Sequence, residues 1–195
     1  MKKIILASSS PQRQELFQKF GFEFWVVPSN FDESSVNIGD PEKLAKALAL
    51  AKAKRVAEFN EDAVVVGADT VVVLGDQVYG KPRDHEHAKE MLTKLSGNTH
   101  SVITGIAIYD ADTHRFLTDA VETKLSFLPV SDLEIEAYVK SGEPFGKAGG
   151  YAIQGLGAFL VEKIDGDYHN VIGLPLSCLA GHLKSFGISG EPEAI

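Results

Sequence analysis

Cysteine is almost absent from this chain of 195 residues, in which Cys178 stands alone. A single cysteine excludes an intramolecular disulfide and a zinc site built from several thiolates. Because Cys178 lies in the apolar stretch 174–180, we interpret it as a small buried thiol.

Long apolar runs are missing as well. The run that follows Lys2 and Lys3 covers only residues 4–7, whereas the apolar region of a signal peptide has about 7–15 residues. No stretch approaches the roughly 18 apolar residues of a membrane span. We therefore expect a cytoplasmic protein that has no membrane partner.

Positive charge is in deficit: 19 basic residues face 27 acidic residues, which gives a net charge of −8. Such a chain repels polyanions at long range, which argues against a nucleic-acid polymer as partner. A small phosphate ligand is still compatible, because salt screens charges beyond about 8–10 Å and a local group of cations then dominates. The hydrophobic share of 44% is enough for a sizeable core and excludes a mainly disordered chain.

Repeats and low-complexity linkers are absent, so we expect one domain over residues 1–189 and a frayed tail at 190–195. Apolar spacing, caps and turn residues predict alternating strands and helices. This order predicts an α/β fold in which helices pack around a mixed sheet. The expected strands are 3–7, 22–27, 63–66, 71–74, 77–79, 99–109, 115–127 and 158–164, and the expected helices are 11–20, 40–59, 84–95, 131–140 and 174–186.

The first candidate site lies where the strand 3–7 meets a helix. Ser8, Ser9 and Ser10 precede Pro11, and Arg13 follows in the first helical turn. Exposed backbone N–H groups and the positive end of a helix suit this turn to an anion. The alternative is that the serines only cap the helix. A Walker loop is excluded because its glycine and lysine pattern occurs nowhere in the chain.

A second candidate site follows the apolar strand 63–66, where Gly67 and Ala68 precede Asp69 and Thr70. We place these residues at the end of that strand. A carboxylate there is costly to desolvate unless it meets a cation or a metal. Lys81, after the expected hairpin, is a candidate cation. The alternatives are an ordinary turn aspartate and a solvated lysine.

The third candidate is Lys52, four residues beyond Leu48 on the helix 40–59, so that it projects beside the buried stripe. Asp32 and Glu33 precede this helix and could offer a hard oxygen ligand to a divalent cation. The alternatives are a lysine whose stem packs on the core while its ammonium reaches water, and a solvated acidic pair.

Two other chemistries do not fit the sequence. His85 and His87 are two residues apart within a helix, so their rings point to different faces and make a poor metal pair. No serine lies in the G-x-S-x-G elbow of a Ser/His/Asp hydrolase.

Taken in order, these motifs closely resemble the Maf nucleotide pyrophosphatases, also called septum-formation-inhibitor-like proteins. The resemblance extends from about residue 3 to residue 185. It is carried by LASSSPxR at 6–13, DE at 32–33, Lys52, GADT at 67–70, GKP at 80–82, LSG at 95–97, GYAIQG at 150–155 and GLPL at 173–176.

The resemblance implies a hydrolase that splits a nucleoside triphosphate between the α- and β-phosphates. It also implies a fold like that of the inosine triphosphate pyrophosphatases, with an elongated twisted sheet and two lobes around a cleft. A divalent cation, Mg²⁺ or Mn²⁺, and a homodimer are implied as well.

Carried onto this chain, the family pattern makes Asp69 the general base, with Lys52 and Lys81 as further catalytic residues. Glu33 and Asp69 would hold the metal. The substrate-binding residues would be Ser8, Ser9, Ser10, Gln12, Arg13, Thr70 and Gln154.

Thr70 and Gln154 match the subgroup that acts on dTTP and UTP. The 7-methyl-GTP subgroup usually carries glutamine and glutamate at these two positions. The dTTP/UTP subgroup usually has arginine where this chain has Gln12. A neutral amide there lacks the charge and the planar fork of a guanidinium, so we expect weaker binding or wider base tolerance.

Three alternatives to a dTTP/UTP pyrophosphatase are open at this point. They are a pyrophosphatase for 7-methyl-GTP or many bases, a nucleotide-binding regulator of cell division with little turnover, and a hydrolase of deaminated purine triphosphates.

Overall fold

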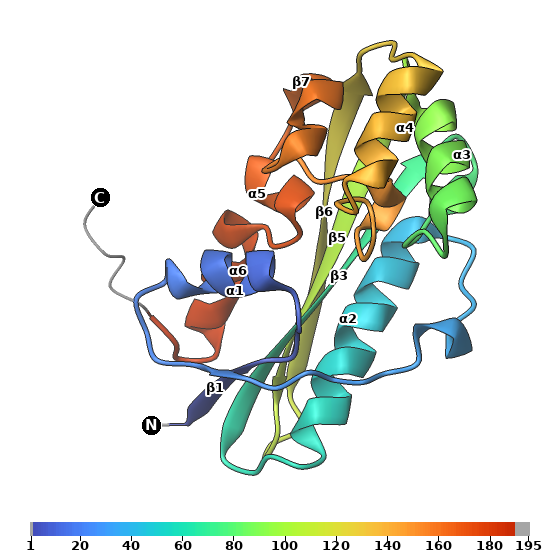
Figure 1. Cartoon of the computed structure of the whole chain (residues 1–195). Coiled ribbons are helices and arrows are strands. Elements are labelled where there is room, and N and C mark those ends of the chain that lie inside the picture. Colours follow the sequence, from blue (N-terminus) through green and yellow to red (C-terminus); the bar gives the residue numbers. More distant parts are fainter. Residues whose placement is uncertain (1, 190–195) are drawn as a thin grey trace. The chain divides into compact units, whose positions relative to one another are not determined.

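A computed structural model describes residues 2–189, so the predicted frayed tail at 190–195 lies outside the described residues. Within these residues one seven-stranded sheet has the strand order β2-β1-β3-β5-β6-β7, with β4 paired to β3, and helices flank it (Figure 1). Strand β1 pairs in parallel with β2 and β3, whereas the pairs β3–β4 and β6–β7 are antiparallel. The sheet is therefore mixed, as the sequence predicts.

The strands are β1 (Lys3–Leu6), β2 (Trp25–Val26), β3 (Ala63–Leu74), β4 (Gln77–Tyr79), β5 (Thr99–Asp110), β6 (Phe116–Phe127) and β7 (Val161–Asp165). The α-helices are α1 (Pro11–Gln18), α2 (Pro41–Ala57), α3 (His85–Leu95), α4 (Asp132–Lys140), α5 (Tyr168–Ile172) and α6 (Leu176–Ser185). Three 3₁₀ turns complete the secondary structure of the described residues: η1 (Glu33–Ser35), η2 (Ala148–Gly150) and η3 (Leu156–Leu160).

The described chain divides into two compact units. The first comprises residues 2–69, 104–121 and 173–189, and the second comprises residues 70–103 and 122–172. Strands β3, β5 and β6 contribute residues to both units. No helix within residues 2–189 is both long enough and apolar enough to cross a membrane.

Helix starts follow the local sequence signals. A short polar side chain accepts a backbone N–H of the first turn and so satisfies one of the otherwise unpaired donors there. In α4 this cap is reciprocal, because the Glu134 side chain also accepts from the backbone N–H of Ser131. The capping residues of α1, α2, α3 and α4 are Ser10, Asp40, Asp84 and Ser131.

Strand β3 corrects one expectation. It runs unbroken from Ala63 to Leu74, so Asp69 and Thr70 lie inside one strand and not at the end of a shorter one. Glycine at position 67 suggests a break, but the β-branched residues that follow continue the strand. Because strand side chains alternate between faces, Asp69 shares its face with Gly67 and Val65.

Two further expectations were wrong in extent. Strand β2 covers only Trp25–Val26 of the expected strand 22–27. Before it, the rings of Phe20, Phe22 and Phe24 pack edge-on against Phe17 at centroid distances of 4.9–5.7 Å. The expected strand 158–164 begins only at Val161, after η3.

Helix α5 was not predicted at all. Its start carries a signal nonetheless, since Asp167 Oδ1 accepts from the backbone N–H of His169 at 2.7 Å and of Asn170 at 3.1 Å.

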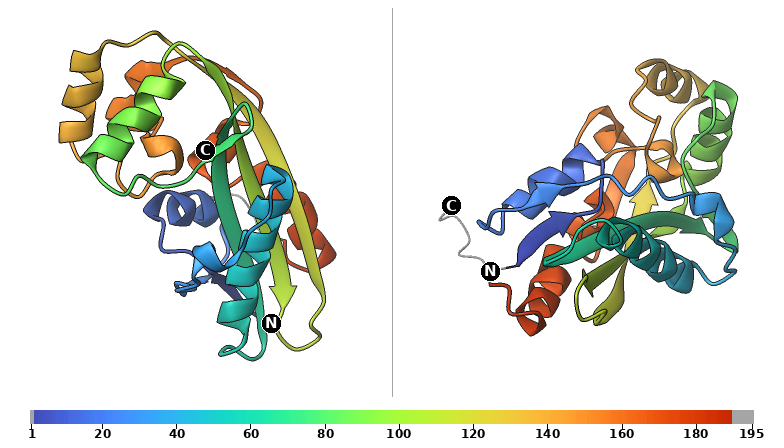
Figure 2. Two further views of the ribbon diagram at one scale, coloured as in Figure 1. Left: turned by 90° about the vertical axis from the view of Figure 1, so that its right-hand side faces the viewer. Right: turned by 90° about the horizontal axis from the view of Figure 1, so that it is seen from below.

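Helix α2 lies along β3 in Figure 1 and in the left view of Figure 2. The contact is close because a glycine faces the helix on each of two strands. A Cβ atom added to Gly67 would lie 2.1 Å from the carbonyl oxygen of Ala49, and one added to Gly105 would lie 2.3 Å from that of Ala45. Small residues on both sides thus bring the helix backbone onto the sheet and determine where the other side chains of α2 lie.

Candidate active site

Lys52 is the centre of an ion cluster in the first unit. Its side chain is only 9% exposed, and its Nζ lies 2.9 Å from Oε1 of Glu33. The same ammonium donates a hydrogen bond to Oδ1 of Asp69, whose side chain is 8% exposed. The lysine is therefore buried between two carboxylates. The interpretation of Lys52 as a chain that reaches water is wrong.

The local sequence positions both carboxylates. Asp69 occupies the β3 face against which α2 packs, and Lys52 precedes Ala53, one of the α2 residues in contact with Gly67. Glu33 begins η1, whose N-cap is Asp32: Oδ1 of Asp32 accepts from the backbone N–H of Ser34 at 3.0 Å. Glu33 is thus held in contact with Lys52, so the interpretation of a merely solvated acidic pair is also wrong.

Arg13 belongs to the same electrostatic environment. Its Nε donates to the carbonyl oxygen of Gly173 at 2.8 Å. Burial lowers the pKa of Arg13, while the charges of Asp69 and Glu33 oppose that change. Because a guanidinium stays protonated in proteins, Arg13 is a second cation near the two carboxylates.

The serines before α1 play different parts. Ser8 is buried, and its Oγ accepts from the backbone N–H of Ser10 at 3.2 Å. Ser10 caps the helix and also donates from Oγ to Oε1 of Gln12 at 3.2 Å. Ser9 is exposed. The capping interpretation is therefore correct for Ser10, and the turn keeps the exposed helix N-terminus that an anion site requires.

The remaining predicted residues, Thr70, Lys81 and Gln154, belong to the second unit. Thr70 is half-buried in β3, Lys81 is exposed just after β4, and Gln154 is exposed in the turn before η3. The structure thus brings Glu33, Lys52 and Asp69 into contact, with Arg13 in their electrostatic environment. It describes the other three within a separate unit.

Tyr138 and Glu143 hold the turn that carries Gln154 from both sides. The Tyr138 hydroxyl accepts from the backbone N–H of Ala152 at 3.1 Å and donates to Oε1 of Glu143 at 2.9 Å. Burial is the main reason why the pKa of the Tyr138 hydroxyl is raised, and the Glu143 carboxylate adds to it. Glu143 also accepts from the backbone N–H groups that follow Gln154, those of Leu156 and Gly157, each at 2.8 Å. No sequence motif marks this pair, and it was not predicted.

The chemistry of Glu33 and Asp69 fits a divalent cation. Magnesium prefers carboxylate oxygens and is usually bound through one or two carboxylates together with substrate phosphates. Both residues direct a carboxylate oxygen to the same ammonium. They could therefore hold such an ion together with phosphate oxygens.

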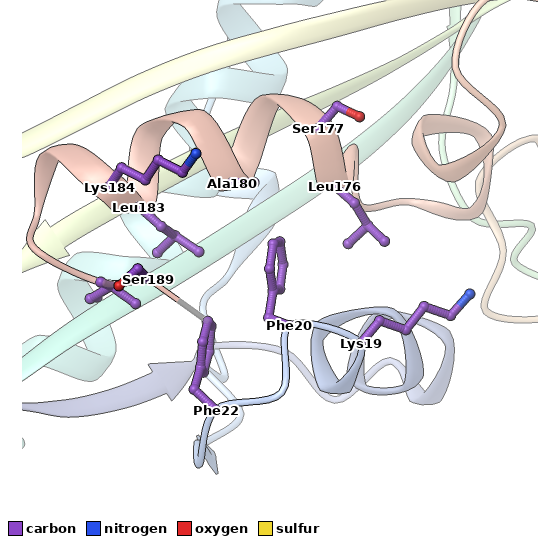
Figure 3. Close-up of a pocket in the computed structure, with 10 residues that line it drawn as sticks. Lys19, Phe20, Phe22, Leu176, Ser177, Ala180, Leu183, Lys184 and Ser189 are labelled. Carbon is purple, nitrogen blue, oxygen red and sulfur yellow. The ribbon is translucent and has the colours of Figure 1, made fainter. Parts of the chain in front are cut away.

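A cavity of about 380 Å³ lies elsewhere in the first unit (Figure 3). Its lining includes the aromatic rings of Phe20 and Phe22 and the side chains of Leu176 and Leu183 on α6. It adjoins the C-terminal end of α1, and that end carries the negative pole of the helix dipole. Among the described residues that line it there is no predicted site residue, so we do not assign the triphosphate to this cavity.

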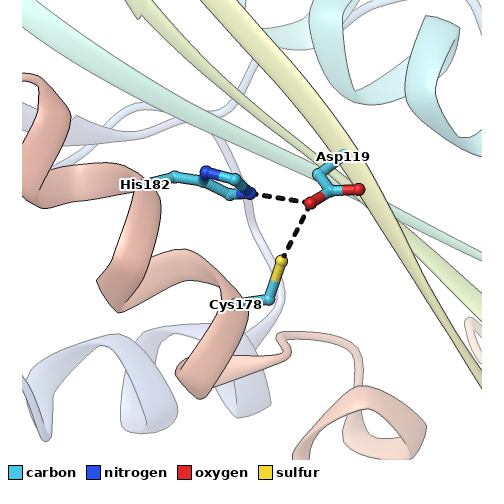
Figure 4. A group of neighbouring side chains, drawn as sticks. All are labelled: Asp119, Cys178 and His182. Atoms are coloured by element: carbon cyan, nitrogen blue, oxygen red, sulfur yellow. Dashed lines mark hydrogen bonds and ion pairs between the residues drawn. The ribbon is translucent and has the colours of Figure 1, made fainter.

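A cluster of Asp119, Cys178 and His182 was also not predicted (Figure 4). Oδ2 of Asp119 lies 2.7 Å from Nε2 of His182 and accepts from Sγ of Cys178 at 3.4 Å. Cys178 is half-buried and has a polar partner, which corrects its interpretation as a buried apolar thiol. The i, i+4 spacing of Cys178 and His182 was the available signal, but Asp119 is 59 residues away from Cys178 in the chain.

Comparisons with known proteins give matches that cover most of the chain. A family model described as "Maf-like protein" matches residues 3–186. A protein of Ruminiclostridium cellulolyticum named dTTP/UTP pyrophosphatase is 45% identical over 185 residues, which cover 94% of this chain and 96% of that protein. A Bacillus cereus protein of the same name is 46% identical over 188 residues, which cover 96% and 92%.

Among solved structures, a HAM1 protein from Coxiella burnetii gives a TM-score of 0.46 at 17% identity, over 65% of this chain and 73% of that one.

Proposed function

This chain belongs to the Maf-like family, and on that premise we propose that it hydrolyses dTTP and UTP to the nucleoside monophosphate and pyrophosphate. The names of its relatives support this proposal, because they are about 45% identical over nearly the whole chain. The single structural observation that carries it is the cluster in which the buried Lys52 and Asp69 meet the partly exposed Glu33. An ammonium between two carboxylates is costly to bury, and such groups are typical of active sites.

In the proposed reaction the oxygen of a water molecule attacks the α-phosphorus, and the bond from that phosphorus to the bridging oxygen breaks. Asp69 orients the water and accepts its proton. Pyrophosphate leaves with the bridging oxygen. A divalent cation, when bound at Glu33 and Asp69, would neutralise the negative charge that develops on the phosphates.

Lys52 and Arg13 supply positive charge for the triphosphate in this account, and the hydroxyls and backbone N–H groups of Ser8–Ser10 add hydrogen bonds. Lys81 is proposed as a further cation on the basis of the family resemblance. The homodimer and the cytoplasmic setting stay predictions from that resemblance and from the composition.

Base recognition is proposed for Thr70 and Gln154. Uracil and thymine each offer two carbonyl acceptors and one N–H donor, which a hydroxyl and an amide can complement. Cytosine reverses part of this pattern, and a site that pairs such groups rejects a base that leaves them unpaired. The amide of Gln12 already accepts a hydrogen bond from Ser10. It also lacks the positive charge of an arginine, so we expect weaker selection between bases.

The test is a panel of canonical and modified nucleoside triphosphates with Mg²⁺, in which pyrophosphate and orthophosphate release are scored separately. We expect pyrophosphate from UTP and dTTP at higher kcat/KM than from CTP. Equal values for CTP and UTP would contradict the base assignment. No pyrophosphate from any substrate at any Mg²⁺ concentration would contradict the activity itself and favour a nucleotide-binding regulator.

A further inference from the structure

The cluster of Asp119, Cys178 and His182 joins two elements of the first unit. Cys178 and His182 are four residues apart on α6 and so lie on one helix face, and Asp119 lies on β6. One ligand atom from each of the three residues lies within 4.8 Å of the others. Figure 4 shows the imidazole and the thiol pointing at the same carboxylate.

The contacts do not resemble those of a thiol nucleophile with its base. In such a pair the imidazole lies next to the sulfur and accepts its proton. Here both Cys178 and His182 contact Oδ2 of Asp119, so the carboxylate is the common partner. The cluster therefore presents sulfur, nitrogen and oxygen donors that converge on one small volume.

We propose that Asp119, Cys178 and His182 form a binding site for a zinc ion or a similar transition-metal ion. Zinc takes sulfur, imidazole nitrogen and carboxylate oxygen at about 2.0–2.3 Å in a tetrahedral arrangement. Ligand atoms so close to one another can surround such an ion after small side-chain shifts. Binding replaces the thiol proton, which is released, and His182 coordinates through Nε2 as the neutral imidazole that carries its proton on Nδ1.

The surroundings support this site. Oδ1 of Asp119 accepts from the backbone N–H of Ala120 at 2.8 Å, which orients Oδ2 towards the other two ligands. The side chains of His182 and Asp119 are 27% and 45% exposed, so an ion can enter and water can complete its shell. Lys46 is a cation whose charge acts on Asp119, but Glu42 pairs with it at 2.6 Å.

The donor set separates this site from the one at Lys52. Thiolate and imidazole favour zinc and similar ions, whereas carboxylates and phosphates favour Mg²⁺. The two sites should therefore bind different ions in the same molecule. The inference does not depend on the proposed hydrolase activity, because its test reads out the metal directly.

The experiment is a titration of the full chain with Co²⁺, a spectroscopic substitute for zinc, in excess Mg²⁺ that occupies oxygen sites. We expect one equivalent of Co²⁺ with a thiolate-to-cobalt charge-transfer band in the near ultraviolet, and zinc should abolish the band by displacement. Cys178→Ser should remove the band. His182→Gln and Asp119→Asn should each weaken Co²⁺ binding about tenfold or more.

The matched control is His85→Gln, which should leave the Co²⁺ titration unchanged because His85 is an exposed residue of α3. Circular dichroism of each variant checks that the fold is kept, and the two near-isosteric variants at His182 and Asp119 test the site without loss of the thiol. Absence of a thiolate band in the unmodified chain would overturn the proposal. An affinity for Co²⁺ that is unchanged in both His182→Gln and Asp119→Asn would overturn it as well.

Discussion

Lys52 illustrates how a single residue links stability to function. Burial of the ammonium and of the Asp69 carboxylate costs on the order of several kcal/mol per ion, and their attraction repays this only with good geometry. An apolar pair of similar volume would stabilise this part of the core at lower cost. The retention of ions here is therefore best explained by chemistry on an anionic substrate.

His100 gives a prediction on pH. It is 2% exposed, its Nε2 lies 2.8 Å from the Tyr151 hydroxyl, and burial lowers its pKa from 6.5 to about 4. Between these two values the unfolded chain binds the proton and the folded chain does not, so stability falls as the pH falls. We expect the histidine to contribute a loss of about 3 kcal/mol in the free energy of unfolding over this range.

The measurement is urea denaturation at a series of pH values between 6.5 and 4. Carboxylates titrate near the lower end, so the quantity of interest is the difference between the unmodified chain and His100→Gln. The variant should lack most of the loss assigned to the histidine. If the free energy of unfolding fell equally with pH in the two proteins, the assignment of this loss to His100 would be contradicted.

At the scale of elements, the contact between α2 and β3 determines where Lys52 lies. In Gly67→Ala the new Cβ would meet the backbone carbonyl of Ala49, which cannot rotate away, so α2 must shift. We expect the free energy of unfolding to fall by about 1–3 kcal/mol. Pyrophosphate release should fall as well, because Lys52 lies one turn beyond Ala49.

The matched control for this prediction is Gly39→Ala, since nothing lies within 4 Å of a Cβ added to Gly39. Both variants are compared by urea denaturation and by pyrophosphate release from UTP. If Gly67→Ala behaved like Gly39→Ala in both assays, the close packing of α2 would not be what positions the lysine.

The turn that carries Gln154 gives a prediction on specificity. In Glu143 one carboxylate oxygen accepts from Tyr138 and Gly157 and the other accepts from Leu156. In Glu143→Gln one of these oxygens becomes an amide NH₂, which donates and cannot accept, so at least one of the three hydrogen bonds is lost. We expect KM for UTP to rise several-fold and the preference for UTP over CTP to shrink, with a smaller change in kcat. Steady-state kinetics on both substrates measure this.

Glu162→Gln, an exposed change on β7, is the control for the lost charge and should leave both substrates unaffected. An unchanged ratio of kcat/KM values for UTP and CTP in Glu143→Gln would show that this pair does not position the turn for base selection.

The elements with strong local signals could be predicted from sequence. Capping residues mark the starts of α1, α2 and α4, and apolar spacing marks α3. Strand β3 was divided wrongly because Gly67 is typical of a turn, whereas its role is to admit a helix backbone. That role depends on α2, and a local pattern does not contain it.

At the scale of the whole molecule, charge is distributed unevenly. The chain as a whole carries −8, yet the charges of Arg13, Lys52, Glu33 and Asp69 cancel. Long-range repulsion of nucleic-acid polymers and local binding of one phosphate ligand are therefore compatible, since salt screens the distant charges.

The residues of the candidate active site could be predicted only in part from the sequence. The motifs around Asp69, Lys52 and Glu33 identified residues that are distant in the chain, and the structure brings these three into contact. The cluster around Asp119 and the support of Gln154 by Glu143 were not predicted. Cys178 and His182 share a helical spacing, but Asp119 reaches them, and Glu143 reaches the turn of Gln154, only through the tertiary fold.

The most direct test of the account is pyrophosphate release from UTP by the unmodified chain and by Asp69→Asn, assayed side by side with Mg²⁺. The amide cannot accept the proton of the attacking water, so kcat should fall by about 10²–10⁴. Asp76→Asn, in the exposed turn between β3 and β4, should keep full activity. Near-normal turnover by Asp69→Asn would contradict the central claim that this carboxylate activates the water.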